Sequence, residues 1–134
     1  MKSLFELKTK MPFDPDVFED MKATAFDLLC NTKKEKYTQA IVLYSAKGNK
    51  YSEIIEDACS KDMTNEKELL EKLKVAGDTE IQYALCVWQD NNIDIPSFAF
   101  REMLSELDQK NQEALLFVMT TEGICATKIS ATMK

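Results

Sequence analysis

The chain has 134 residues, of which 45% are hydrophobic, and this suits a single compact domain over residues 1–134 rather than a disordered chain. The formal net charge of −6 argues against a nucleic-acid partner, because proteins that bind nucleic acids carry basic patches. The sequence contains no histidine, so the commonest metal ligand and general base is missing. We also expect no membrane contact, because no apolar run is long enough to cross a bilayer.

Cysteine usage indicates a reduced protein. The four cysteines are Cys30, Cys59, Cys86 and Cys125, and no two have the CxxC spacing of a zinc ribbon or a redox dithiol. Three of them follow or lie among apolar residues, which predicts buried thiols. Residues 1–10 lack the apolar run of a signal peptide, so we expect a cytoplasmic location.

The first predicted elements are a helix and a strand pair. A helix is expected over residues 15–30, because Asp14 offers a capping carboxylate and apolar residues then recur along one face. Two strands follow over residues 38–45 and 51–56. A turn at Gly48 joins them, since glycine tolerates positive φ, and this predicts an antiparallel pair.

Two helices and three strands complete the chain. We expect the helices over residues 64–76 and 96–107, and the strands over residues 81–88, 114–120 and 124–129. Thr64 is expected to cap the first of these helices, and Gly77 to end it. The strand over residues 81–88 is almost continuously apolar, as expected for a central strand covered on both faces. Residues 89–95 are polar and predict a loop, and Ser97 is placed to cap the second helix.

The predicted order is therefore α-β-β-α-β-α-β-β. Such an order gives an α/β fold in which helices cover a sheet of about five strands. Strands linked through helices imply that part of the pairing is parallel.

One stretch of the sequence resembles a known motif in addition to its helical pattern. The run Pro96-Ser97-Phe98-Ala99-Phe100-Arg101 resembles the second motif of the cytidine deaminases, Pro-Cys-x-x-Cys-Arg followed by a helix. Glu66, in Thr64-Asn65-Glu66-Lys67, lies 30 residues before Pro96 and resembles the glutamate of the first motif, His/Cys-Ala-Glu. The chain length and the order of elements are also those of the small cytidine deaminases. The resemblance implies a three-layer α-β-α sandwich around a mixed sheet.

The resemblance also implies that the zinc ligands are missing. In such deaminases one His or Cys and two further Cys hold a zinc ion that activates water, while the glutamate moves protons. The three ligand positions here hold Thr64, Ser97 and Phe100. Neutral hydroxyls are poor zinc ligands and phenylalanine is none, so we expect a degenerate site with neither metal nor cofactor. Glu66 would then be a vestigial proton-shuttle residue.

A ligand contact is implied at a second glutamate. Residues 54–58 resemble Asn-x-Glu-Asn-Ala, whose Asn and Glu hold the ribose of the nucleoside, and this makes Glu56 a candidate ligand-binding residue. Each site residue also has a structural interpretation. Glu66 suits the first turn of any helix, Glu56 suits the end of a strand, and Arg101 is equally suited to a structural ion pair.

Three functions therefore stay open. The first is a catalytically inactive deaminase-like protein, a homo-oligomer with a binding or assembly role. The second is a nucleoside-metabolising enzyme, a cytidine or deoxycytidine deaminase that keeps its activity through an unrecognised metal set. The third is a plain nucleoside-binding module that retains the pocket.

Overall fold

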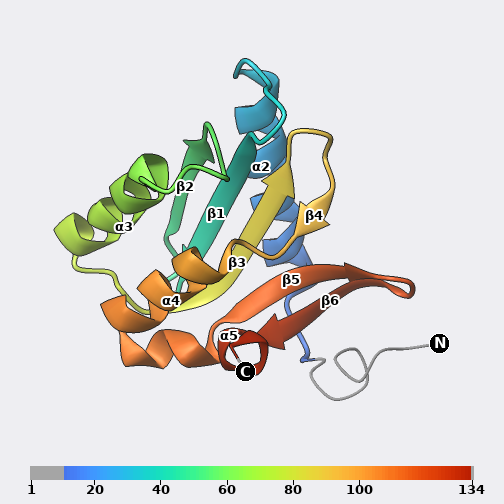
Figure 1. Ribbon diagram of the computed structural model, residues 1–134. Helices are drawn as coiled ribbons and strands as arrows, with labels where there is room; N and C mark the ends of the chain where they lie inside the picture. Colours follow the sequence, from blue (N-terminus) through green and yellow to red (C-terminus); the bar gives the residue numbers. More distant parts are fainter. Residues whose placement is uncertain (1–10, 134) are drawn as a thin grey trace.

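A mixed sheet of six strands forms the middle layer of the computed structural model (Figure 1). The structure describes residues 11–133, and the prediction made for residues 1–10 lies outside them. In chain order, the elements are α2 (Pro15–Cys30), β1 (Gln39–Ser45), β2 (Lys50–Ile55), α3 (Thr64–Ala76), β3 (Ile81–Trp88), β4 (Ile93–Asp94), α4 (Phe98–Leu107), the short 3-10 helix η1 (Gln109–Glu113), β5 (Leu115–Thr120), β6 (Gly123–Lys128) and α5 (Ile129–Thr132).

The strand order is β2-β1-β3-β5-β6. β1 is antiparallel to both of its neighbours, β5 and β6 are antiparallel to each other, and β3 and β5 are parallel. The α4 crossover between β3 and β5 therefore gives the parallel pairing that the element order predicts. The sixth strand, β4, was expected to be loop. Its two residues pair with the end of β3 through Cys86↔Asp94 and Val87↔Ile93 and are too few to produce a sequence pattern.

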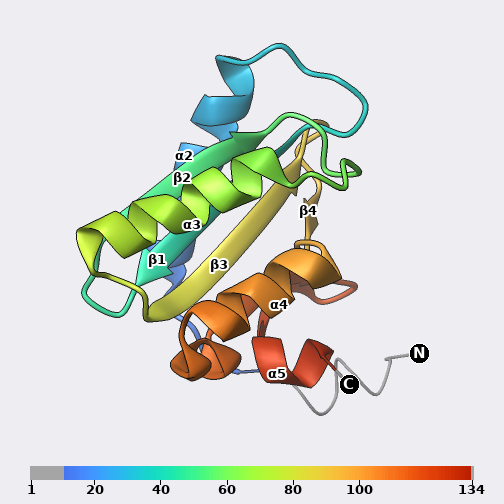
Figure 2. The same ribbon diagram turned by 60° about the vertical axis from the view of Figure 1, so that its left-hand side comes forward.

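Helices cover both faces of the sheet, which confirms the three-layer sandwich. Figure 2 shows α3 and α4 in front of the strands and α2 behind them. One apolar cluster fills the space between α2 and the sheet, and its largest members include Phe18, Met21, Leu29 and Phe117. The second lies under α3, α4 and α5, and includes Ile41, Leu69, Leu73, Phe100 and Leu104. Both clusters contain residues of β1 and β3, as alternation along central strands requires.

Helix ends follow the sequence signals in three places and depart from them in one. Asp14 Oδ1 accepts hydrogen bonds at the start of α2, Ser97 Oγ accepts one from the Phe100 N–H, and Gly77 ends α3 with a φ of 66°. The expected cap at Thr64 is wrong. Thr64 is the first helical residue, and the cap position falls on Met63, which has a φ of 52° and makes no side-chain capping bond.

Two other sequence expectations need correction. Only Cys86 is buried; Cys125 is partly covered, and Cys30 and Cys59 are exposed, although all four thiols are free. The element order did not include η1 or α5, two short segments that carry no recognisable periodicity. Within residues 11–133, no helix combines the length and the apolar character needed to cross a membrane.

Hydrogen bonds to Asp78 link the end of α3 to the β1–β2 turn and the start of β2. Its side chain is only 2% exposed, and Oδ2 accepts hydrogen bonds of 2.9 Å from Asn49 Nδ2 and from the Tyr51 hydroxyl. Burial by itself would raise the pKa of Asp78. Hydrogen bonds from Asn49, Ser45 and Tyr51 outweigh burial, so the pKa lies below its usual value. The ionised carboxylate therefore stabilises the fold.

We expect Asp78→Asn to lower the free energy of unfolding at pH 7 by roughly 1 kcal/mol, after allowance for solvent screening near the surface. Because the pKa of Asp78 is lowered in the fold, its contribution is complete above the ordinary aspartate pKa and is lost as pH falls through the folded value. Urea denaturation at a series of pH values checks this. A difference between the two proteins that is absent at neutral pH would contradict it.

Candidate functional site

The residues singled out in the sequence lie near the end of β3. Figure 2 shows that α3 and α4 both begin on the side of the molecule where β3 ends. The thiol of Cys86 in β3 has a pKa well above its usual value, first because it is buried and then because of the nearby carboxylates Asp94 and Glu66. The start of α3, the end of β3 and the short strand β4 are thus close enough for their charges to interact.

Glu66 is an almost fully buried acid, with 4% of its surface exposed. Its carboxylate accepts no hydrogen bond from the side chain of any other residue within 11–133. Burial raises the pKa of Glu66, and the charge of Asp57 adds to the effect, while its own backbone N–H and Lys67 act in the opposite direction. A carboxyl group in this setting has an increased tendency to hold a proton.

Glu66→Gln is expected to raise the free energy of unfolding at pH 7 by roughly 1 kcal/mol, because it removes a buried charge that accepts no hydrogen bond from another side chain within residues 11–133. The folded pKa of Glu66 is raised, so the wild-type protein loses stability as pH rises through that value. The advantage of the variant should therefore disappear under acidic conditions. Urea denaturation at several pH values measures it, with the exposed Glu68→Gln as the matched control. A gain that is the same at every pH would contradict the account.

Phe100 occupies the centre of the apolar cluster beneath α3 and α4, with 0% of its surface exposed. Its burial follows from the helical pattern, since Phe100 and Leu104 lie on the same face of α4. The other two predicted ligand positions lie at helix starts. Thr64 is exposed at the first residue of α3, and Ser97 is exposed at the cap of α4. The three positions therefore present two surface hydroxyls and one carbon ring.

Arg101 is a structural residue in this fold. Its guanidinium is 8% exposed and donates to two backbone carbonyls, from Nε to Pro96 at 3.0 Å and from Nη1 to Thr132 at 3.0 Å. It also stacks on the Phe98 ring, with Cζ 5.6 Å from the ring centroid. These contacts join the start of α4 to the C-terminal helix α5, and they account for the burial of an arginine that has no carboxylate within ion-pair distance among residues 11–133.

Glu56 lies beside a cleft of about 360 Å³ at the edge of the sheet. The cleft is lined by the loop after α2, the end of β2 and the first turn of α3, and its residues are Thr32, Lys33, Glu35, Thr38, Glu53, Ile54, Glu56 and Asn65. The Glu56 N–H donates to Asn65 Oδ1 at 2.9 Å. This bond places Glu56 next to the helical turn that carries Glu66.

Sequence reasoning missed several members of this region. Asn65 gave no signal beyond its place in a helix start. Asp94 fell in an expected polar loop, and Cys86 was considered only as a remote thiol of the central strand. The proximity of Asp94 to Cys86 depends on the pairing of β4 with β3, which no local pattern predicted.

The described side chains of this region do not form a metal site. Among residues 11–133, no group of three or more His, Cys, Asp and Glu side chains is arranged to hold one. The hydroxyl of Ser97 is engaged by the Phe100 N–H, and the Cys86 thiol is held in its protonated form by burial. The described residues at the three ligand positions thus do not fit a zinc ion, which needs thiolate, imidazole or carboxylate ligands.

Comparison with solved structures gives a consistent result at the level of the fold. No family model and no curated protein matches the sequence. The cytidine deaminase of Mycobacterium leprae is 15% identical, with a TM-score of 0.63 over 87% of this chain and 96% of that chain. The enzyme of Mycobacterium tuberculosis is 10% identical, with a TM-score of 0.62 over 86% and 92%. That of Burkholderia pseudomallei is 13% identical, with a TM-score of 0.62 over 84% and 92%. At these identities the likeness establishes architecture alone: the chain has a cytidine deaminase-like fold.

Proposed function

We propose that this chain is a single-domain, catalytically inactive protein of the cytidine deaminase-like fold that works by binding or assembly. The burial of Phe100 is the observation that carries the proposal. A ring with no exposed surface fills the position that corresponds, by the motif resemblance, to a zinc-binding cysteine. Without a bound metal, water keeps a pKa near 15.7 instead of about 7, so it is a poor nucleophile at neutral pH.

An activity assay tests this proposal. Purified protein is incubated with cytidine and with deoxycytidine, and the release of ammonia is followed. We expect no turnover above the rate of a Glu66→Gln control, since the single carboxylate cannot replace the metal. Turnover that depends on Glu66 would overturn the proposal.

One observation favours the alternative of a nucleoside-metabolising enzyme. Glu66 is buried and its pKa is raised, and a general acid–base residue commonly has these properties. The same burial also follows from the position of Glu66 in the first turn of α3, over the end of β3. The activity assay above distinguishes the inactive protein from the enzyme, because only the enzyme would release ammonia from the nucleoside.

A retained nucleoside site is the binding role we propose first. Glu56 lines a cleft at the end of β2, which is where the motif resemblance puts the contact to the sugar. Hydroxyl groups of a ribose are suitable donors to an unpaired carboxylate. A thermal-shift panel of purine and pyrimidine nucleosides tests it. Binding should raise the melting temperature of the wild type and not that of Glu56→Ala, and a panel without any shift would exclude the site.

We further propose a homo-oligomer in the cytoplasm, without nucleic-acid or membrane partners. Val75 and Met119 are large apolar side chains with 81% and 57% of their surface exposed, and such positions are suited to a subunit contact. Sedimentation velocity measures the state directly. We expect a dimer or tetramer, and a monomer at all accessible concentrations would reject this part of the proposal.

A further inference from the structure

At Ile54, the outer edge of β2 has backbone groups that no other residue within 11–133 binds. β2 is the last strand on its side of the sheet, so alternate residues point their backbone groups away from β1. Ser52 and Glu56 show the direction: the Ser52 carbonyl accepts from Lys72 Nζ at 2.9 Å, and the Glu56 N–H donates to Asn65 Oδ1. By the same alternation, the N–H and C=O of Ile54 point outward between them. No side chain within residues 11–133 caps these two groups.

A groove with an excess of negative charge runs along this open position. Its lining, given above for the cleft, contains three carboxylates, Glu35, Glu53 and Glu56, against the single ammonium group of Lys33. Glu35 and Glu53 have ion-pair partners in Lys33 and Lys72, respectively. Glu56 has no ion-pair partner among the described residues. With Lys33 and Lys72 both counted against the three carboxylates, one negative charge remains, at Glu56, and this charge attracts a positively charged group.

The walls of the groove are already fixed in place. The Thr38 hydroxyl accepts from the Glu35 N–H at 3.0 Å and donates to the Glu56 carbonyl at 3.3 Å. A further backbone bond of 2.9 Å joins the Ala58 N–H to the Tyr37 carbonyl. The loop after α2 and the end of β2 are thus held together. A preformed groove costs less ordering free energy when it binds a ligand.

We propose that this groove binds an extended, lysine- or arginine-rich segment of a partner protein, which adds a short strand beside β2. Main-chain bonds to the N–H and C=O of Ile54 would fix the segment, as in other cases of strand addition to a sheet edge. Basic side chains on the two faces of the segment would reach Glu53 and Glu56, because side chains at positions 53 and 56 of an extended chain point to opposite faces of the sheet.

A second copy of this chain is a less suitable occupant. Its net charge is also −6, and its own β2 edge brings the same acidic groove, so the two copies would repel each other there. The inference goes beyond the proposed function but uses the same cleft and Glu56, so a basic segment and a nucleoside would compete for this site.

The probe is an acetylated and amidated heptapeptide of lysine, which carries positive charge on both faces of an extended chain, titrated into isotopically labelled protein and followed by NMR. We expect the amide signals of Ser52 and Ile54 to shift, and hydrogen exchange at Ile54 to slow on saturation. The same peptide methylated at its central backbone nitrogens should bind at least tenfold more weakly, because it cannot pair with an edge strand. A peptide with glutamate in place of lysine should not bind.

Charge variants of the protein give the second test. Glu53→Lys combined with Glu56→Lys should weaken peptide binding about tenfold. The control, Glu68→Lys combined with Glu71→Lys, makes the same change in net charge on the exposed side of α3 and should have little effect. The spectrum of each free variant shows whether it is folded. The proposal is overturned if the peptide does not bind, if methylation makes no difference, or if both pairs of substitutions weaken binding equally.

Discussion

Phe100→Ala is expected to lower the free energy of unfolding by about 3–5 kcal/mol, as for other large-to-small changes in well-packed cores. Phe100 has no exposed surface and lies in the cluster that joins α3 and α4 to the sheet. Removal of the ring loses its transfer free energy and leaves a cavity. Chemical denaturation at neutral pH provides the measurement.

The matched control is Phe98→Ala, two residues earlier on the same helix. Phe98 is 51% exposed, and the guanidinium of Arg101 stacks on its ring. We expect a loss below about 1 kcal/mol for this change. Comparable losses at the two positions would show that Phe100 does not fill the core as described.

Asn111→Ala is expected to lower the free energy of unfolding by roughly 3 kcal/mol, because it removes three hydrogen bonds. The Ile81 N–H and the Thr79 carbonyl are left without their side-chain partner, while the Leu104 carbonyl keeps its bond from the Asp108 N–H. Asn111 has 0% of its surface exposed. Its Oδ1 accepts from the Ile81 N–H at 2.7 Å, and its Nδ2 donates to the carbonyls of Thr79 and Leu104 at 2.9 Å each. One amide thus joins the start of β3 to the end of α4.

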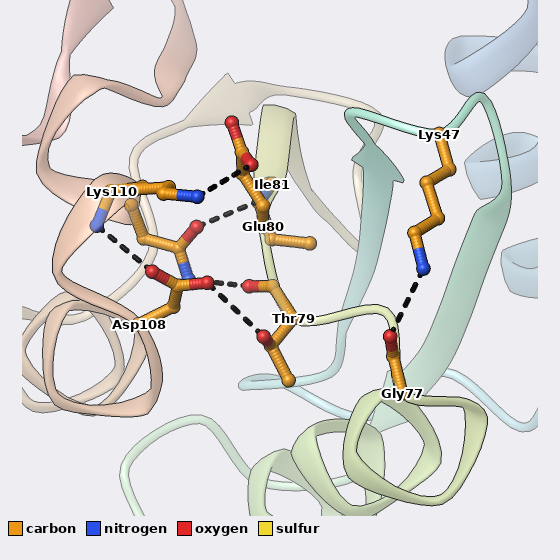
Figure 3. A network of polar contacts seen from close by, with 8 residues as sticks. Lys47, Gly77, Thr79, Glu80, Ile81, Asp108 and Lys110 are labelled. Atoms are coloured by element: carbon orange, nitrogen blue, oxygen red, sulfur yellow. Dashed lines mark hydrogen bonds and ion pairs between the residues drawn. The ribbon is translucent and has the colours of Figure 1, made fainter.

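Other polar contacts surround this junction but are more exposed. Figure 3 shows the Asp108 carboxylate between the Thr79 hydroxyl and the Lys110 N–H, and the Lys110 ammonium near Glu80. The control is Gln112→Ala, an exposed neighbour of Asn111 in η1. Thermal and urea unfolding should show little change for the control. A loss below about 1 kcal/mol for Asn111→Ala would contradict the bonding described here.

Local sequence signals were sufficient for most of the fold. The helix over Pro15–Cys30 and the strand over Ile81–Trp88 have the predicted bounds, because a capped apolar stripe and an apolar run each describe their own segment. The parallel pairing of β3 with β5 followed from the intervening helix. The three-layer architecture was implied by the motif resemblance and is confirmed by helices on both faces of the sheet.

The parts that the sequence did not predict depend on contacts between distant segments. β4 has two residues and exists because β3 extends beyond β5. The role of Asn111 depends on three segments that meet around one side chain, and the hydrogen-bond partners of Arg101 depend on a C-terminal helix without periodicity. For the candidate site, the burial of Phe100 follows from its helical spacing with Leu104. The interaction of Glu66 and Asp94 with Cys86 required the assembled sheet.

The metal content of the purified protein tests the central claim most directly. The chain is expressed in zinc-supplemented medium, purified by gel filtration and analysed by mass spectrometry for zinc per chain. Because Thr64, Ser97 and Phe100 offer no thiolate, imidazole or carboxylate ligand, we expect far less than stoichiometric zinc. One tightly held zinc ion per chain would contradict the account.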